Sequence, residues 1–157
     1  MNLNQFKSVW EKEGKDPVKV IELFMQAVLE YEKDQEKGTY MISYLIPKDD
    51  CVENSDSPTG LVPNPRGAGY YLKQMLKDPN IVRSYVGGTP QNKYGIDEKN
   101  LELKVVKKEI QGDRARIVIK SAGKDSPTPV KLRLEDGYWK IESGSISSIA
   151  TGVKKPE

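Results

Sequence analysis

Apolar residues recur at helical spacing in the first part of the chain. One group predicts a short helix over residues 4–13. Its members are Phe6, Val9 and Trp10. A longer stripe predicts a helix from Asp16, whose carboxylate can accept the free amide hydrogens of a first turn, to about residue 37. The stripe consists of Val20, Ile21, Phe24, Ala27, Val28 and Tyr31.

Three further segments complete the helical half of the pattern. The apolar run 40–46 stops at Pro47, and its length allows either further helical turns or a buried strand. Residues 49–65 are rich in Asp, Ser, Asn, Pro and Gly, which predicts an irregular loop. A loop of that length is either functional or partly mobile. A short helix is predicted over residues 69–77.

From residue 81 the period of the pattern changes to two, as in β-strands. Residues 81–86 are predicted to form a short strand, and four later stretches alternate apolar with charged positions. Their apolar positions are Leu101, Leu103, Val105, Ile117, Ile119, Val130, Leu132, Leu134, Trp139 and Ile141. Turns are predicted at residues 111–113 and 136–137, the second because Asp-Gly accepts positive φ at both central positions. This pattern indicates an antiparallel meander with one buried and one solvated face.

Helices followed by an antiparallel sheet predict a segregated α+β fold. The sequence has no internal repeat and no second apolar core, so we expect residues 1–157 to form one domain. Its helical part covers about 4–77 and its sheet part about 81–150. The order of elements is similar to the nuclear-transport-factor-2-like cone, in which helices cap a strongly curved sheet and leave a pocket between them. That similarity concerns topology and carries no function.

Composition narrows the class of protein. The chain is 36% hydrophobic and 31% charged, which indicates a globular domain with a heavily solvated exterior. Its single cysteine, Cys51, cannot form an intrachain disulfide. The first residues lack the basic segment and apolar run of a signal peptide, and no apolar stretch approaches the ~20 residues of a membrane span. We therefore expect a cytoplasmic protein without a membrane partner.

The formal net charge of +2 is unevenly distributed. Residues 1–50 carry 7 basic and 10 acidic groups, a net of −3, and residues 51–157 carry 18 basic and 13 acidic groups, a net of +5. The basic residues that could share the polar face of the sheet are Lys104, Arg114, Arg116, Lys120, Lys131, Arg133 and Lys140. Such a row could hold phosphate or a polyanion, but lysines on strands also prevent edge-to-edge aggregation. Nucleic acid is disfavoured as a partner, because the strands supply few outward-facing aromatic rings.

Several kinds of chemistry are excluded or disfavoured. The absence of histidine removes the commonest general base, the usual catalytic triads and most transition-metal sites. No dinucleotide-binding or P-loop glycine motif occurs, so we expect neither a cofactor nor a metal. Asp49 and Asp50 are more typical of solvated acids than of a catalytic pair. Cys51 is expected to be inert, because neighbouring carboxylates raise the pKa of a thiol.

Two segments resemble motifs of a known family. Residues 84–94, SYVGGTPQNKY, resemble a "SYF-GATPENNY" motif. Residues 119–133, IKSAGKDSPTPVKLR, resemble a "-RSSGADSPR-VKLR" motif, which is followed by a tryptophan where Trp139 stands. Both motifs belong to a family of uncharacterised bacterial domains, and the resemblance runs from about residue 40 to residue 156.

The resemblance implies a bacterial origin, one α+β domain and no assigned activity. Two departures affect the surroundings of Tyr94: residues 95–98 lack the family's proline-rich approach to the next strand, and the loop 49–65 is longer. The motif residues nominated for ligand or partner binding are Tyr85, Asn92, Tyr94, Ser126, Lys131 and Arg133. The alternative for the segment 85–94 is an ordered loop that caps the sheet, with half-buried tyrosines.

The leading hypothesis is a non-enzymatic domain, monomeric or homodimeric, that binds a small ligand or a protein partner near these motifs. One alternative is an anion or nucleic-acid binder that uses the basic sheet face. The other is a carboxylate-dependent enzyme of the cone-shaped fold.

Overall fold

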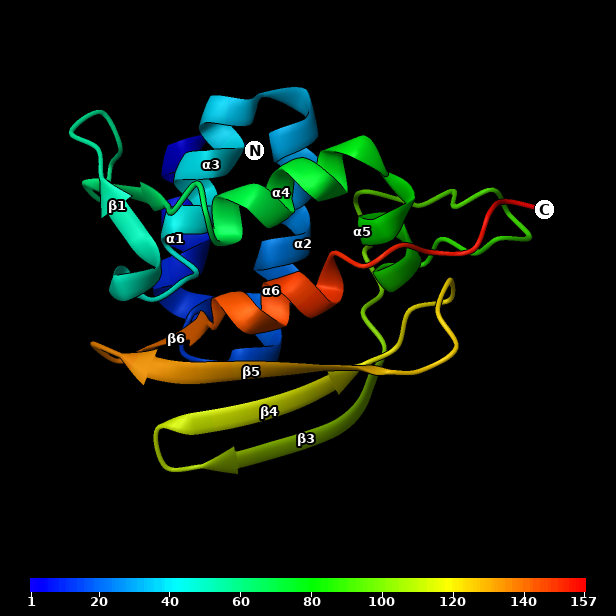
Figure 1. Ribbon diagram of the computed structural model, residues 1–157. Coiled ribbons are helices and arrows are strands. Elements are labelled where there is room, and N and C mark those ends of the chain that lie inside the picture. The colour runs from blue at the N-terminus through cyan, green and yellow to red at the C-terminus, as the bar shows by residue number, and fades with distance from the viewer.

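The computed structural model describes residues 1–157 as a layer of helices beside a four-stranded sheet, with a small hairpin to one side (Figure 1). The predicted α+β class is therefore confirmed. The helices are α1 (Leu3–Glu13), α2 (Pro17–Lys33), α3 (Gln35–Ser43), the 3-10 turn η1 (Lys48–Asp50), α4 (Ala68–Lys77), α5 (Asn80–Tyr85) and α6 (Ser143–Ile149). The strands are β1 (Cys51–Glu53), β2 (Leu61–Pro63), β3 (Val105–Gln111), β4 (Arg114–Ile119), β5 (Thr128–Glu135) and β6 (Tyr138–Ile141).

The first two helices begin where side chains satisfy their free amide groups. Asn2 accepts the N–H of Gln5 at 2.8 Å, and the Gln5 side chain accepts the N–H of Asn2 at 2.9 Å, which forms a reciprocal cap for α1. Asp16 accepts from Val18 at 2.9 Å at the start of α2. The helix predicted over residues 4–13 and the start predicted at Asp16 are both confirmed.

The prediction of one helix continuing to about residue 37 is wrong. Asp34 adopts an extended conformation with φ −152°, which ends α2 and begins α3. Its carboxylate accepts the N–H of Lys37 at 3.1 Å, so the break carries its own cap. After the break α3 packs so closely on α2 that a Cβ at Gly38 would overlap the backbone of Tyr31. The apolar run 40–46 resolves as helix through Ser43 and a turn beyond it.

Other local predictions also need correction. Residues 81–85 belong to helix α5 and residue 86 to the turn after it, and not to a strand, because Ile81, Val82 and Tyr85 face the core at helical spacing. The expected irregular loop 49–65 contains η1 and the antiparallel hairpin of β1 and β2. Residues 101–104, where alternation predicted a strand, lie outside the sheet, and α6 was not foreseen.

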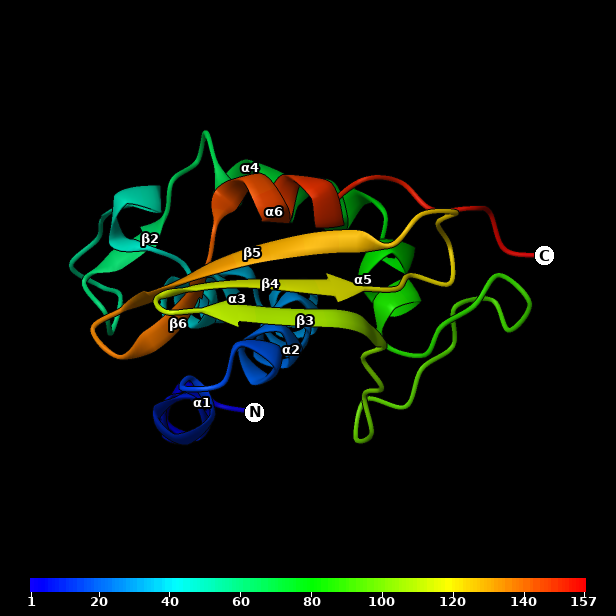
Figure 2. The same ribbon diagram turned by 90° about the horizontal axis from the view of Figure 1, so that it is seen from below.

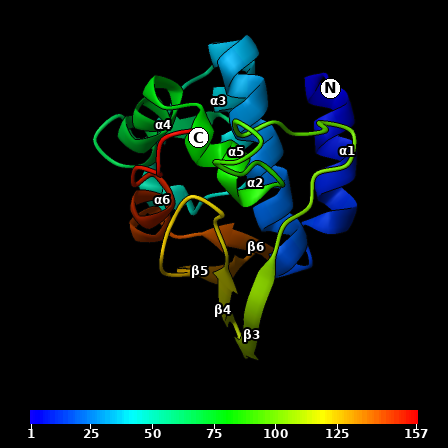
Figure 3. The ribbon, with the colours of Figure 1, turned by 90° about the vertical axis from the view of Figure 1, so that its right-hand side faces the viewer.

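The large sheet is the predicted meander, with strand order β3-β4-β5-β6 and every pair antiparallel (Figure 2). Gly112 has φ +60° in the turn between β3 and β4. Asp136 and Gly137 have φ +55° and +85° between β5 and β6, as the Asp-Gly turn predicted. Strand β3 forms the outer edge, extends beyond the helices (Figure 3), and is exposed along all 7 residues.

One hydrophobic cluster of 31 buried residues joins the helices to one face of this sheet. Ile117 of β4, Val130 of β5 and Ile141 of β6 point into it. Alternate residues such as Arg116 and Lys131 point to the opposite, open face. Helix α6 lies along β5, between the sheet and α4 (Figure 1). None of the helices is both long enough and apolar enough to span a membrane.

Candidate functional site

The two segments that resemble family motifs pack against each other. Ser121 donates a hydrogen bond to the hydroxyl of Ser84 at 2.6 Å, and the hydroxyls of Tyr85 and Thr128 lie 2.8 Å apart. A Cβ at Gly123 would stand 2.7 Å from the Tyr94 hydroxyl oxygen, so this approach requires glycine. The fold therefore brings the two motifs together through groups that are mostly buried.

The two nominated tyrosines lie inside this junction. Tyr85 and Tyr94 are each 1% exposed, and the Tyr94 hydroxyl donates to the carbonyl oxygen of Lys154. Burial raises the pKa of Tyr85 to about 12. Direct contact with a ligand would require these rings to leave the core. Such deep burial is typical of tyrosines that stabilise the fold, whereas tyrosines that contact a ligand are usually half-buried.

Asn92 holds a surface turn together. Its side-chain oxygen accepts the N–H of Thr89 at 2.8 Å and the N–H of Gly95 at 3.1 Å. The turn includes two residues with positive φ, Lys93 at +58° and Tyr94 at +57°. The amide oxygen of Asn92 is thus committed to the backbone of its own loop.

Lys124, which no sequence argument singled out, is the ionic centre of the junction. Its ammonium donates to the Tyr85 hydroxyl at 2.7 Å, to the carbonyl of Ile149 at 2.9 Å and to that of Ser148 at 3.3 Å. The two carbonyls end α6, where a cation is favoured by the helix dipole. Burial lowers the pKa of Lys124 to about 8. Lys124 could be identified as a residue of the junction only from the position of α6, and the sequence pattern did not predict that helix.

Ser126 stands exposed beside a broad polar cleft of about 700 Å³. The cleft lies between the loop 123–129 and the segment 148–154, and Val153 supplies its apolar lining. Asp125 and Lys154 form an ion pair of 2.6 Å across it. Asp125 and Lys154 therefore neutralise each other, whereas Lys124, which also lines the cleft, donates to uncharged groups.

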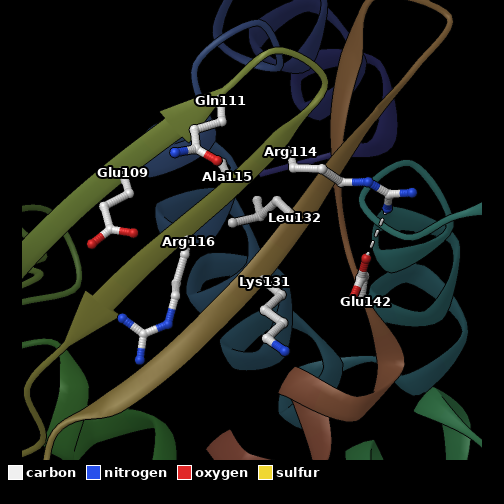
Figure 4. A pocket seen from close by; sticks show the side chains of 8 residues that line it. All are labelled: Glu109, Gln111, Arg114, Ala115, Arg116, Lys131, Leu132 and Glu142. Atoms are coloured by element: carbon white, nitrogen blue, oxygen red, sulfur yellow. Dashed lines mark hydrogen bonds and ion pairs between the residues drawn. The ribbon is translucent and has the colours of Figure 1, made fainter.

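Lys131 and Arg133 lie elsewhere, on the open face of the large sheet. Strand register places Arg116 opposite Lys131 and Arg114 opposite Arg133. A shallow depression of about 350 Å³ lies over β3, β4 and β5 (Figure 4). Its lining consists of Glu109, Gln111, Arg114, Ala115, Arg116, Lys131, Leu132 and Glu142.

The cations of this face fall into two groups. Arg114 pairs with Glu142 at 3.2 Å, and Arg133 pairs with Asp49 of η1. Arg116 and Lys131 make no ion pair, and their side chains leave adjacent strands in the same direction (Figure 4). Glu109 is the strand partner of Arg116 but bonds Lys107 at 2.8 Å. The Arg116–Lys131 pair thus combines two neighbouring positive charges that no carboxylate neutralises within ion-pair distance.

The predicted row of seven basic residues is only partly formed. Lys120 donates its ammonium protons to the backbone of Lys124 at 3.1 Å and of Asp125 at 3.4 Å. Lys140 is buried and donates to the carbonyl of Tyr44 at 2.7 Å. Neither belongs to the lining of the depression, whose basic residues are Arg114, Arg116 and Lys131. Alternation along the strands could not reveal this, because segments outside the sheet cover its last strand.

The acidic candidates and the cysteine are engaged in structural contacts. Asp49 pairs with Arg133, and Asp50 accepts the N–H of Ser143 at 3.2 Å. Burial, together with the charge of Asp50, raises the pKa of the Cys51 thiol to about 12, in line with the expected inert cysteine. No three His, Cys, Asp or Glu side chains are grouped as a metal site would require.

Comparison with known proteins gives a family but no characterised relative. No curated protein and no solved structure matches the chain. A family model described as "Domain of unknown function (DUF6935)" matches residues 1–157, which is the whole chain. By this match, the chain belongs to the DUF6935 family of domains of unknown function.

Proposed function

We propose that the chain is a non-enzymatic binding domain whose open sheet face receives an anionic group between Arg116 and Lys131. The observation that carries the proposal is the pair of cations that lie directly opposite each other on β4 and β5, neither of which forms an ion pair. Like charges in directly opposite positions destabilise a sheet. A carboxylate or phosphate bound between them would relieve that repulsion.

The two side chains suit this role. An arginine presents a planar fork of donors that matches a carboxylate or phosphate, and a lysine adds a mobile point charge. Arg114, which lines the depression, and the neighbouring Arg133, which does not, already have acidic partners. An anionic ligand is therefore expected to bind at Arg116 and Lys131, the two cations of the depression without an ion pair.

A small ligand or an acidic protein segment fits this face better than nucleic acid. The lining residues include no aromatic ring on which a base could stack. Glu109 and Glu142 also line the depression and would repel an extended chain of phosphates. The carboxylate-dependent enzyme has less support, since Glu142 pairs with Arg114 and the acids of other cavities bind donors.

The test is a titration of the ¹⁵N-labelled protein with inorganic phosphate and with succinate. We expect saturable shifts centred on Arg116 and Lys131 that weaken as sodium chloride is added, because salt screens exposed charges. The double variant Arg116→Gln, Lys131→Gln should lose these shifts while remaining folded. Lys108→Gln is the matched control, because Lys108 is exposed on the other face of β3 and should keep them. Unchanged binding by the double variant would contradict the proposal.

We also infer that the domain spans residues 1–157. Support comes from the single hydrophobic cluster, which contains residues of both the helical part and the sheet. The cone-like architecture, the bacterial origin and the cytoplasmic location stay predictions from the sequence and its family resemblance.

A further inference from the structure

A second cavity, of about 410 Å³, lies where α1, the end of α3, the β1–β2 hairpin and the β5–β6 turn meet. It shares no lining residue with the depression around Arg116 and Lys131. Its volume falls within the range of roughly 300–1,000 Å³ that is usual for small-molecule sites. The lining mixes aromatic, apolar and charged side chains, as such sites do.

Three aromatic side chains build one wall of this cavity. Trp10 of α1 stacks on Tyr138 of β6 with ring centroids 4.1 Å apart and planes 20° apart. The Tyr44 ring lies 4.9 Å from Trp10 at an angle of 50°. The indole Nε1 of Trp10 is buried and has no hydrogen-bond partner. Rings of this kind offer a large apolar surface with polar groups at its edge.

Lys140 supplies a buried cation to the same cavity. It alternates with the core residues Trp139 and Ile141, so it points to the face of β6 that Trp10 and Tyr44 cover. The residue is 9% exposed, and its ammonium lies 5.2 Å from the centroid of the Trp10 ring. Its one hydrogen bond goes to the carbonyl oxygen of Tyr44 at 2.7 Å.

The acids that line the cavity form no ion pair with Lys140, whose pKa is lowered by burial although the nearby charge of Glu135 acts to raise it. Glu135 accepts the backbone N–H of Lys48 at 3.2 and 3.3 Å. Asp136 pairs with the Lys48 ammonium at 3.1 Å. No carboxylate lies within 4.0 Å of the Lys140 ammonium, which makes it a buried cation without an ionic partner. A buried charge in that state is costly unless another group pairs with it.

We propose that this cavity binds a small aromatic monocarboxylate, whose carboxylate accepts hydrogen bonds from Lys140 and whose ring packs against the wall of Trp10, Tyr44 and Tyr138. A single negative charge matches the single buried ammonium, since Lys7, the other cavity lysine without an ion pair, is exposed to solvent. A dianion such as a phosphate monoester would meet repulsion from Glu135 and Asp136, which line the cavity as well. The aromatic wall favours a planar apolar body over an aliphatic polar one.

The first experiment follows the indole N–H resonances of the ¹⁵N-labelled wild-type protein during titration with benzoate and 1-naphthoate. The chain has two tryptophans, and Trp139 lies in the core and outside the cavity lining. We expect a saturable shift of the Trp10 indole resonance while that of Trp139 stays in place. The neutral probes benzamide and 1-naphthamide should bind at least tenfold more weakly. Equal affinity for acid and amide, or no saturable shift of Trp10, would overturn the proposal.

The second experiment uses Lys140→Met, which keeps the length of the side chain and removes its charge. Calorimetric titration should show at least a tenfold loss of 1-naphthoate affinity and little change for 1-naphthamide. The thermal midpoint of the unliganded variant should equal or exceed that of the wild type, because an unpaired buried charge has been removed. Lys108→Met is the matched control, because Lys108 is exposed and lines neither cavity, and it should keep full 1-naphthoate affinity. An unchanged affinity in the Lys140 variant would refute the role of this lysine, and the wild-type titration decides the site if the variant does not fold.

Discussion

The motif junction and the aromatic cavity both contain a half-buried or buried lysine, and the two lysines differ in their partners. At the junction, Lys124 donates to a tyrosine hydroxyl and to two carbonyls that end α6. In the cavity, Lys140 has one carbonyl partner. A polar network whose members satisfy one another stabilises a fold, whereas a buried charge with unused donors can accept a ligand. The comparison identifies the junction as structure and the cavity as a candidate site.

The largest expected effect tests the structural half of this comparison. Tyr94→Ala removes a buried ring from the junction and should lower the free energy of unfolding by about 3–5 kcal/mol, the range for large aromatic-to-alanine changes in cores. Tyr94→Phe keeps the ring and removes only the hydroxyl that bonds Lys154, so it should cost about 0.5–1.5 kcal/mol. Urea unfolding followed by circular dichroism measures both.

A small loss of stability in Tyr94→Ala would show that the ring is not part of the core, and would restore it as a candidate binding residue. The same result would require the turn 89–95 to move, because Tyr94 is held by the backbone that Asn92 fixes.

The sequence predicted the sheet better than the helices, for a physical reason. Alternation along β5 and the first half of β4 reports directly which face is buried, and the Asp136–Gly137 turn has positive φ. Helix α5 has only 6 residues, and so short an apolar segment is compatible with either a helix or a strand. Helix α6 has the sequence SGSISSI, whose serines are more typical of loops than of helices.

The candidate sites were less predictable, because a sequence shows which residues are polar but not what satisfies them. Tyr85 and Tyr94 have polar tips that could face either a ligand or the interior, and the structure places them inside. Lys131 lies on the open face of the sheet, and its nomination for binding stays a prediction. Lys140 belongs to the same alternating pattern, and only the packing of Trp10 and Tyr44 removes it from solvent.

A pH experiment sharpens the comparison through Lys124. Its pKa lies at about 8 in the folded protein and at 10.5 ordinarily, so the unfolded chain binds more protons between these values. Stability should therefore rise as the pH increases from about 8. Lys124→Met should remove the part of the rise that Lys124 contributes, and Lys140, whose pKa is also lowered by burial, should keep its own part. Chemical unfolding at several pH values measures the change as a flatter profile.

Cys51 limits the pH range over which the rise due to Lys124 can be measured. The pKa of its thiol is raised from 9.0 to about 12 in the folded protein, so stability should fall with pH above 9.0. The variant Cys51→Ser should extend the rise due to Lys124 toward pH 10. Identical pH profiles for the wild type and Lys124→Met would show that this lysine is as solvated as one on the surface, and the contrast with Lys140 would fail.

The smallest expected effect is a change in the free energy of unfolding caused by a substitution on the open face. The prediction concerns the sign of that change. If Arg116 and Lys131 repel each other, Lys131→Thr should raise the free energy of unfolding by about 0.2–1 kcal/mol. Lys108→Thr makes the same change on β3, where the strand partner is the uncharged Ile117, and so controls for β-propensity. The difference between the two variants should shrink in 1 M salt, because the screening length falls to about 3 Å. If Lys131→Thr loses more stability than Lys108→Thr, Lys131 has a stabilising acidic partner, and Glu109 and Glu142 are the acids that line the depression with it. The repulsion on which the proposed anion site rests would then be absent.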